Sequence, residues 1–114
     1  MAISKNEIVA ELISEGKKVF GNQWDQIETY VKVEFKKIGD QIKDILKNVA
    51  EYKKDKSKGY SKETGKILLK MQRTSTEAVL VSATILTLVA VQAALDAVFK
   101  ALKKAFATAL TGLL

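Results

Sequence analysis

Eighteen consecutive residues in the last third of the chain, 78–95, carry no charged side chain. Only Ser82, Thr84, Thr87 and Gln92 are polar among them. As a helix, this run would be about 27 Å long, just short of a typical hydrocarbon core of about 30 Å. Its strongly apolar residues would point in every direction, which is typical of a helix in a protein core or in a membrane.

The rest of the composition predicts helices throughout. The 114 residues include no proline and only six glycines. Proline breaks helix interiors and punctuates loops, so little interrupts a helix here. No Asn-Gly or Asp-Gly hairpin turn is present. We therefore predict one all-α domain over 1–114, an elongated helical hairpin or three-to-four-helix bundle with a long apolar C-terminal helix.

Caps and apolar spacing divide the chain into three expected helices. The first covers about 4–20, because Ser4 and Glu7 have the spacing of a capping box. The second covers about 22–54. Its apolar residues recur every three or four positions as one narrow stripe: Trp24, Ile27, Val31, Phe35, Ile38, Ile42, Ile45, Val49 and Tyr52.

A lysine-rich turn then precedes the third helix, which we expect over about 61–112 with Ser61 as its cap. A second capping-box pattern at 74–77 leaves open a kink near residue 75. The only tryptophan, Trp24, is interpreted as a core residue, with an interface anchor as the alternative.

The predicted helix over 78–95 has more apolar circumference than two neighbouring helices can cover. Large exposed apolar patches are rare on soluble monomers, so lipid, further copies of the chain or another protein would have to cover the remainder. Beyond Asp96 a lysine face lies opposite a Phe/Leu face, a pattern typical of interfacial helices and also of ordinary bundle helices. Lys100, Lys103 and Lys104 are the candidates for contact with an anionic surface. The expected membrane or oligomer contacts are Val79, Val81, Ile85, Leu88, Val89, Phe99, Leu102, Phe106 and Leu110.

The chain has no histidine and no cysteine, so it lacks the usual general base, the thiolate nucleophile and the softer metal ligands. Carboxylates spaced four residues apart, such as Glu7 and Glu11 or Asp40 and Asp44, are interleaved with lysines, and we expect them to be solvated. No catalytic, cofactor-binding or metal-binding residues, no cofactor and no small-molecule substrate are therefore expected.

The net charge of +6 is spread along the chain. The lysine-rich turn at 53–62, with Tyr52 and Tyr60 nearby, has the residue types that bind nucleic acid. A solvated turn explains it better, so nucleic acid is not expected as a partner. The first fifteen residues include four charges of both signs, so no signal peptide is expected there. For localisation, association with a membrane or an assembly is favoured over a free cytoplasmic state.

Two functions remain open at this point. The first is a non-enzymatic, self-associating helical protein whose apolar C-terminal helix contacts a membrane or the core of an assembly, as in pore-forming, virion or filament subunits. The alternative is a soluble helical-bundle adaptor or oligomeric scaffold that shares this helix as its core. A homo-oligomer is expected in both cases, and membrane lipid is a partner only in the first.

Overall fold

The computed structural model describes residues 4–110 and 113, and within them the protein is an all-α helical bundle with no strand. Four helices make up the bundle, and two short elements accompany them. In chain order the elements are α1 (Lys5–Phe20), η1 (Gly21–Gln23), α2 (Trp24–Lys54), α3 (Lys62–Ala83), α4 (Leu88–Ala105) and α5 (Ala107–Leu110).

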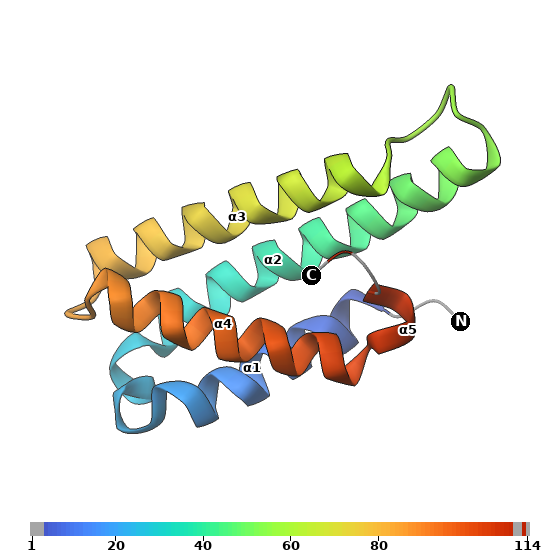
Figure 1. Ribbon diagram of the computed structural model, residues 1–114. Coiled ribbons are helices and arrows are strands. Elements are labelled where there is room, and N and C mark those ends of the chain that lie inside the picture. Colours follow the sequence, from blue (N-terminus) through green and yellow to red (C-terminus); the bar gives the residue numbers. More distant parts are fainter. Residues whose placement is uncertain (1–3, 111–112, 114) are drawn as a thin grey trace.

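Successive helices run antiparallel (Figure 1). Helix α1 packs against α2 and α4, and α3 packs against the same two helices, so α1 and α3 lie diagonally across the bundle. The molecule measures 46 × 24 × 19 Å, with its long dimension along the helices. The α2–α3 turn therefore lies at one end, and the α1–α2 and α3–α4 turns lie together at the other.

Side-chain caps begin three of the four long helices. The hydroxyl of Ser4 accepts from the Glu7 N–H at 3.1 Å, which confirms Ser4 as the cap of the first helix. Ser61 caps α3 in the same way, as predicted. The third cap is Thr87, whose hydroxyl accepts from the Ala90 N–H at 3.2 Å at the start of α4. It lies inside the uncharged run.

The prediction of one long apolar helix through 78–95 is wrong. Helix α3 ends at Ala83, four residues turn, and α4 begins at Leu88. The Thr84 hydroxyl bonds back to the Leu80 carbonyl and also accepts from the Leu86 N–H at 3.1 Å. A threonine hydroxyl bonded to the backbone stabilises a turn, whereas the same bond inside a helix slightly destabilises and bends it.

Breaking the run supplies the fourth helix that the bundle needs. A continuous helix would expose much of its circumference, whereas the fold turns α4 back against α1 and α3. Leu80 of α3 is fully buried, as are Val91, Leu95 and Val98 of α4. These four side chains are thus covered within one chain. No helix over the described ranges is both long and apolar enough to cross a membrane.

The alternative of a kink near residue 75 is not observed, because α3 continues unbroken from Lys62 to Ala83. The Thr74 hydroxyl donates to the Lys70 carbonyl one turn earlier, and Thr76 faces the bundle interior. Both side chains therefore have partners that leave α3 intact. The predicted end of the third helix near 112 falls outside the described residues.

Small residues let the helices approach closely. A Cβ at Gly39 of α2 would lie 2.5 Å from the Val9 Cγ2 of α1, and one at Gly65 of α3 would lie 2.6 Å from the Ile45 Cγ2 of α2. Gly59, in the α2–α3 turn, adopts φ +59° beside the Asn48 carbonyl, a conformation that favours glycine. The helix pairs are therefore fitted tightly along α2.

Candidate interaction surface

The α3–α4 turn presents apolar side chains to solvent on a firmly held backbone. Leu86 points inward and is buried, which anchors the turn, and the Thr84 and Thr87 hydroxyls bond its backbone on either side. Ile85, between these anchors, is 83% exposed. Leu88 and Val89 in the first turn of α4 are 48% and 76% exposed. We call these three residues, Ile85, Leu88 and Val89, the apolar tip.

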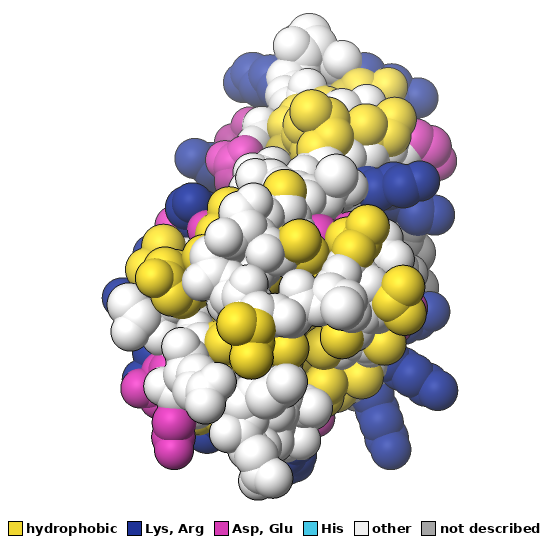
Figure 2. Space-filling view, turned by 90° about the vertical axis from the view of Figure 1, so that its left-hand side faces the viewer, with side chains coloured by type: hydrophobic (Ala, Val, Ile, Leu, Met, Phe, Trp, Pro, Cys, Tyr) yellow, Lys and Arg dark blue, Asp and Glu magenta, His cyan; other side chains and the backbone are white. Residues whose placement is uncertain are grey.

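Viewed along the bundle from this end, apolar and uncharged side chains occupy most of the surface, while lysine and arginine project at its rim (Figure 2). Beside the apolar tip, a hollow of about 240 Å³ separates the end of α1 from the start of α4. Its lining contains no charged residue: Val19, Phe20, Gln23, Leu86, Ala90, Ala93 and Ala94.

Exposed apolar side chains continue along the outside of α3. Ile67 and Met71 are 61% and 63% exposed, and with Lys70 and Thr74 they border a shallow depression. One or two turns further on, the exposed residues are Ala78 and Ser82. We call the exposed set Ile67, Met71, Thr74, Ser75, Ala78 and Ser82 the α3 outer face. At 1.5 Å per residue, the distance from Ile67 to Ile85 is about 27 Å.

Helix α2 adds apolar residues along one edge of the α3 outer face. The contact between Thr76 and Glu34 fixes the antiparallel register of the two helices. Because the helices are antiparallel, the turn of α2 that precedes Glu34 lies opposite the turn of α3 that follows Thr76. Tyr30 and Val33, which are both exposed, fall at that level. They extend the uncharged area sideways near the tip.

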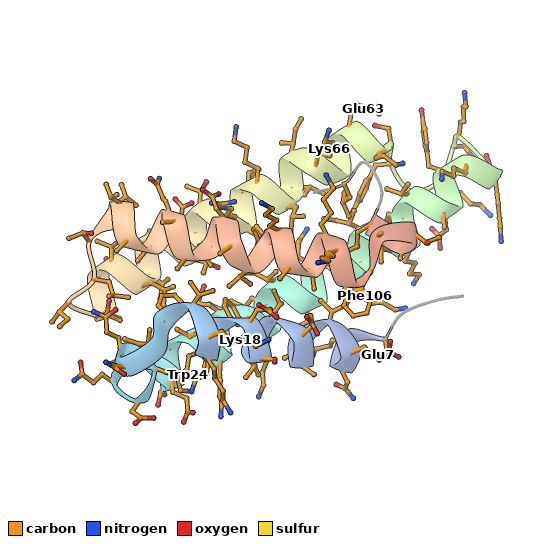
Figure 3. The ribbon with its side chains drawn as sticks, turned by 60° about the horizontal axis from the view of Figure 1, so that its bottom comes forward. Glu7, Lys18, Trp24, Glu63, Lys66 and Phe106 are labelled. Carbon is orange, nitrogen blue, oxygen red and sulfur yellow. The ribbon has the colours of Figure 1, made fainter. Side chains whose placement is uncertain are left out.

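Apart from Lys70, the charged groups lie beside this surface or at the opposite end of the bundle. Along the α3–α4 seam Arg73 pairs with Glu77 and Asp96, so these three charges are satisfied beside the surface. The lysines concentrate at the opposite end of the bundle, where residues 47–66 include seven lysines and three acidic residues, a net +4 out of the chain's +6. In Figure 3, Glu63 and Lys66 point outward from the start of α3 at that end.

The structure separates the contact residues expected from the sequence into three groups. Ile85, Leu88 and Val89 are exposed and form the apolar tip. Val79, Val81 and Phe106 are half-buried, and Phe99, Leu102 and Leu110 are buried in this chain's own core, so the latter three would meet a partner only if the bundle opened. Lys100, Lys103 and Lys104 are exposed, on the later turns of α4.

Sequence reasoning missed Ile67 and Met71. A usable signal exists, because the buried residues Gly65, Leu69 and Thr76 define the inner face of α3 and these two apolar residues fall outside it. Trp24 is buried beside Gly16, and its indole N–H donates to Glu28 at 2.8 Å, so the prediction of a core residue is confirmed. Figure 3 shows Trp24 at the α1–α2 corner.

Nothing in the described part of the chain brings three potential metal ligands together. Comparison with protein-family models, with curated proteins and with solved structures gives no match. The class that the fold itself defines is an antiparallel four-helix bundle with an apolar tip at one end and a lysine-rich turn at the other.

Proposed function

We propose that the protein is a non-enzymatic, self-associating helical subunit whose copies meet through the α3 outer face and the apolar tip. The observation that carries the proposal is the exposure of Ile67, Met71, Ile85, Leu88 and Val89 on a surface whose other residues are Ala, Ser and Thr, with Lys70 beside them. Covering such side chains is favourable by about 25 cal/mol per Å² of apolar area removed from water.

Charge limits where a second copy can dock. Each chain carries +6, so contact between two copies costs least where few charges meet. The α3 outer face and the apolar tip contain no charged residue, and Lys70 borders their depression. Thr74, Ser75 and Ser82 also suit a protein partner, because their hydroxyls can exchange hydrogen bonds across an interface. A two-fold arrangement would bring the same surface of both copies together.

The size of the surface sets the expected strength. A strip about 27 Å long and one helix wide, roughly 10–12 Å, covers on the order of 300 Å² per copy. Standard stable interfaces bury about 800 Å² per partner. We therefore expect weak association that depends on protein concentration.

Sedimentation velocity from micromolar to millimolar protein tests this proposal. Ile85→Lys and Met71→Lys each place a charge in the interface, and each should weaken association about tenfold or more, which corresponds to about 1.4 kcal/mol. Ala10→Lys is the matched control, because Ala10 is exposed on α1, diagonally across the bundle from α3. Folding should survive all three changes, since each replaces an exposed side chain.

A chain that sediments as a monomer throughout, or variants that associate as Ala10→Lys does, would refute self-association. Contact with lipid is the second candidate, because Ile85, Leu88 and Val89 expose apolar side chains together at one end of the bundle. Flotation with liposomes separates the two. Binding that Val89→Lys abolishes, in a chain that stays monomeric in water, would favour lipid.

A further inference from the structure

The lysine-rich end of the bundle contains a pocket that the proposed self-association does not use. The pocket has a volume of about 300 Å³ and lies where the last turns of α2 meet the start of α3 and α5. Six of its nine lining residues are apolar, so a ligand that fills it must bring apolar surface. They are Ile45, Leu46, Val49, Ala50, Ala109 and Leu113, and the others are Lys53, Lys62 and Thr108.

The two lysines come from different helices. Lys53 belongs to the last turn of α2, and Lys62 is the first residue of α3. Neither takes part in an ion pair with the described residues. Both ammonium groups are therefore available to an anion at the pocket.

Nearby acidic groups do not neutralise this end. Asp55, in the turn, accepts from the N–H and the hydroxyl of Ser57 at 3.0 and 2.7 Å, and these hydrogen bonds lower the pKa of its carboxyl. Across residues 47–66 the lysines outnumber the acidic residues by four. The surroundings favour a ligand with a negative group.

We propose that this pocket binds the alkyl chain of a free fatty acid, with its carboxylate held between Lys53 and Lys62. The apolar lining selects the chain, and the two ammonium groups select the carboxylate. A volume of about 300 Å³ lies at the lower limit for small-molecule sites, which indicates a medium-length chain such as that of decanoate. A phosphate or a nucleotide would leave the apolar lining unfilled.

Isothermal titration with decanoate, below its micelle concentration, tests the site on the full chain. Saturable binding with one equivalent is expected, together with much weaker binding of decanol, which lacks the charge, and of butyrate, which lacks the chain. Lys53→Gln with Lys62→Gln should weaken decanoate binding about five- to tenfold. Lys56→Gln with Lys58→Gln is the matched control, because it removes the same charge from exposed positions in the adjacent turn.

A steric variant tests the pocket independently of charge. Ala50 is exposed and lines the pocket, so Ala50→Phe should fill it and abolish binding, while circular dichroism reports an unchanged helical fold. Equal loss of affinity in the two lysine double variants, no saturable binding, or full affinity in Ala50→Phe would each overturn the proposal.

Vesicles separate a free fatty acid from a membrane surface. Vesicles of phosphatidylglycerol and phosphatidylcholine offer anionic headgroups without free acid. If the chain binds these vesicles but not decanoate, and both lysine double variants lose vesicle binding equally, charge alone recruits a membrane and the pocket proposal fails. Self-association is measured separately through Ile85→Lys, at the other end of the bundle, so each proposal can fail without the other.

Discussion

Helix α3 has two neighbours, and its seam with α2 is buried whereas its seam with α4 is partly open to solvent. On the α2 side the Thr76 hydroxyl donates to Glu34 at 3.1 Å inside the bundle, and Glu34 is only 2% exposed. The second carboxylate oxygen of Glu34 accepts from the Lys37 ammonium at 2.9 Å. Every polar atom of this small network is therefore paired, as burial requires.

On the α4 side Arg73 holds the seam. It pairs with Glu77 on its own helix and with Asp96 on α4, and it donates to the Gln92 carbonyl at 3.2 Å. Its guanidinium lies 5.2 Å from the centre of the Phe99 ring. Because Asp96 is largely exposed, water and ions reach this network. The stability of the α2–α3 seam should thus depend on packing and hydrogen bonding, and that of the α3–α4 seam on ionic strength.

The largest effect is expected from Gly65→Val, which places a branched side chain where a Cβ alone would be 2.6 Å from the Ile45 Cγ2. Overpacking of this kind costs about 3 kcal/mol of unfolding free energy. Ala78→Val on the exposed side of α3 is the control and should cost less than about 0.5 kcal/mol. Urea denaturation followed by circular dichroism measures both, and equal stabilities would mean that the α2–α3 seam is not tightly packed.

Thr76→Val keeps the shape of the side chain but removes the donor to Glu34. The buried Oε1 of Glu34 loses its partner, and we expect a loss of about 2 kcal/mol. Combining Thr76→Val with Glu34→Leu removes both polar groups and should recover much of that loss. If the double variant loses more unfolding free energy than the two single variants together, the network contributes more than the pairing of Thr76 with Glu34.

Part of this architecture is readable from the sequence. The all-α class follows from the absence of proline and the regular apolar spacing, and the caps at Ser4 and Ser61 follow from residue type and position. The stripe of α2 is also readable, because its residues from Trp24 to Ile45 occupy the core as their spacing predicts. Each of these features is determined by residues close together in the sequence, so short sequence patterns predict it.

The break at 84–87 is not readable in the same way. Thr84 and Thr87 each suit a helix interior that returns its hydroxyl to the backbone, and each suits a turn or a cap. What decides is tertiary packing, because α4 must fold back to cover the apolar faces of α1 and α3. The exposure of Ile85, and the burial of Phe99 that the sequence assigns to a partner surface, both depend on that turn.

The open seam gives a smaller and salt-dependent effect. Arg73→Met removes the ion pairs and the contact with Phe99 but keeps an apolar stem, and should cost about 1 kcal/mol at low salt. At 1 M salt the screening length falls to about 3 Å, so most of the electrostatic part of that cost should disappear. Lys66→Met, an exposed change of equal charge on the same helix, controls for net charge.

The contrast between the seams predicts that only the α3–α4 seam responds to salt. The cost of Thr76→Val should stay nearly constant between low and high salt, because its partner Glu34 is shielded from solvent. Urea titrations of both variants at the two salt concentrations make the comparison. If the cost of Arg73→Met is equally insensitive to salt, the α3–α4 seam is buried like the α2–α3 seam.

The smallest effect concerns the ionisation of Tyr60, where the α2–α3 seam reaches its turn. Burial and then the charge of Asp44, which accepts its hydroxyl at 3.4 Å, raise the pKa of Tyr60 above 10.0. A raised pKa means that the fold favours the neutral phenol, so the contribution to stability is complete below pH 10.0 and is lost as the pH rises through the raised value. Asp44→Asn should return the pKa toward 10.0. Absorbance titration measures the pKa of Tyr60 in a chain with Tyr30→Phe and Tyr52→Phe, in which Tyr60 is the only tyrosine. An unchanged pKa in Asp44→Asn would leave burial as the sole cause.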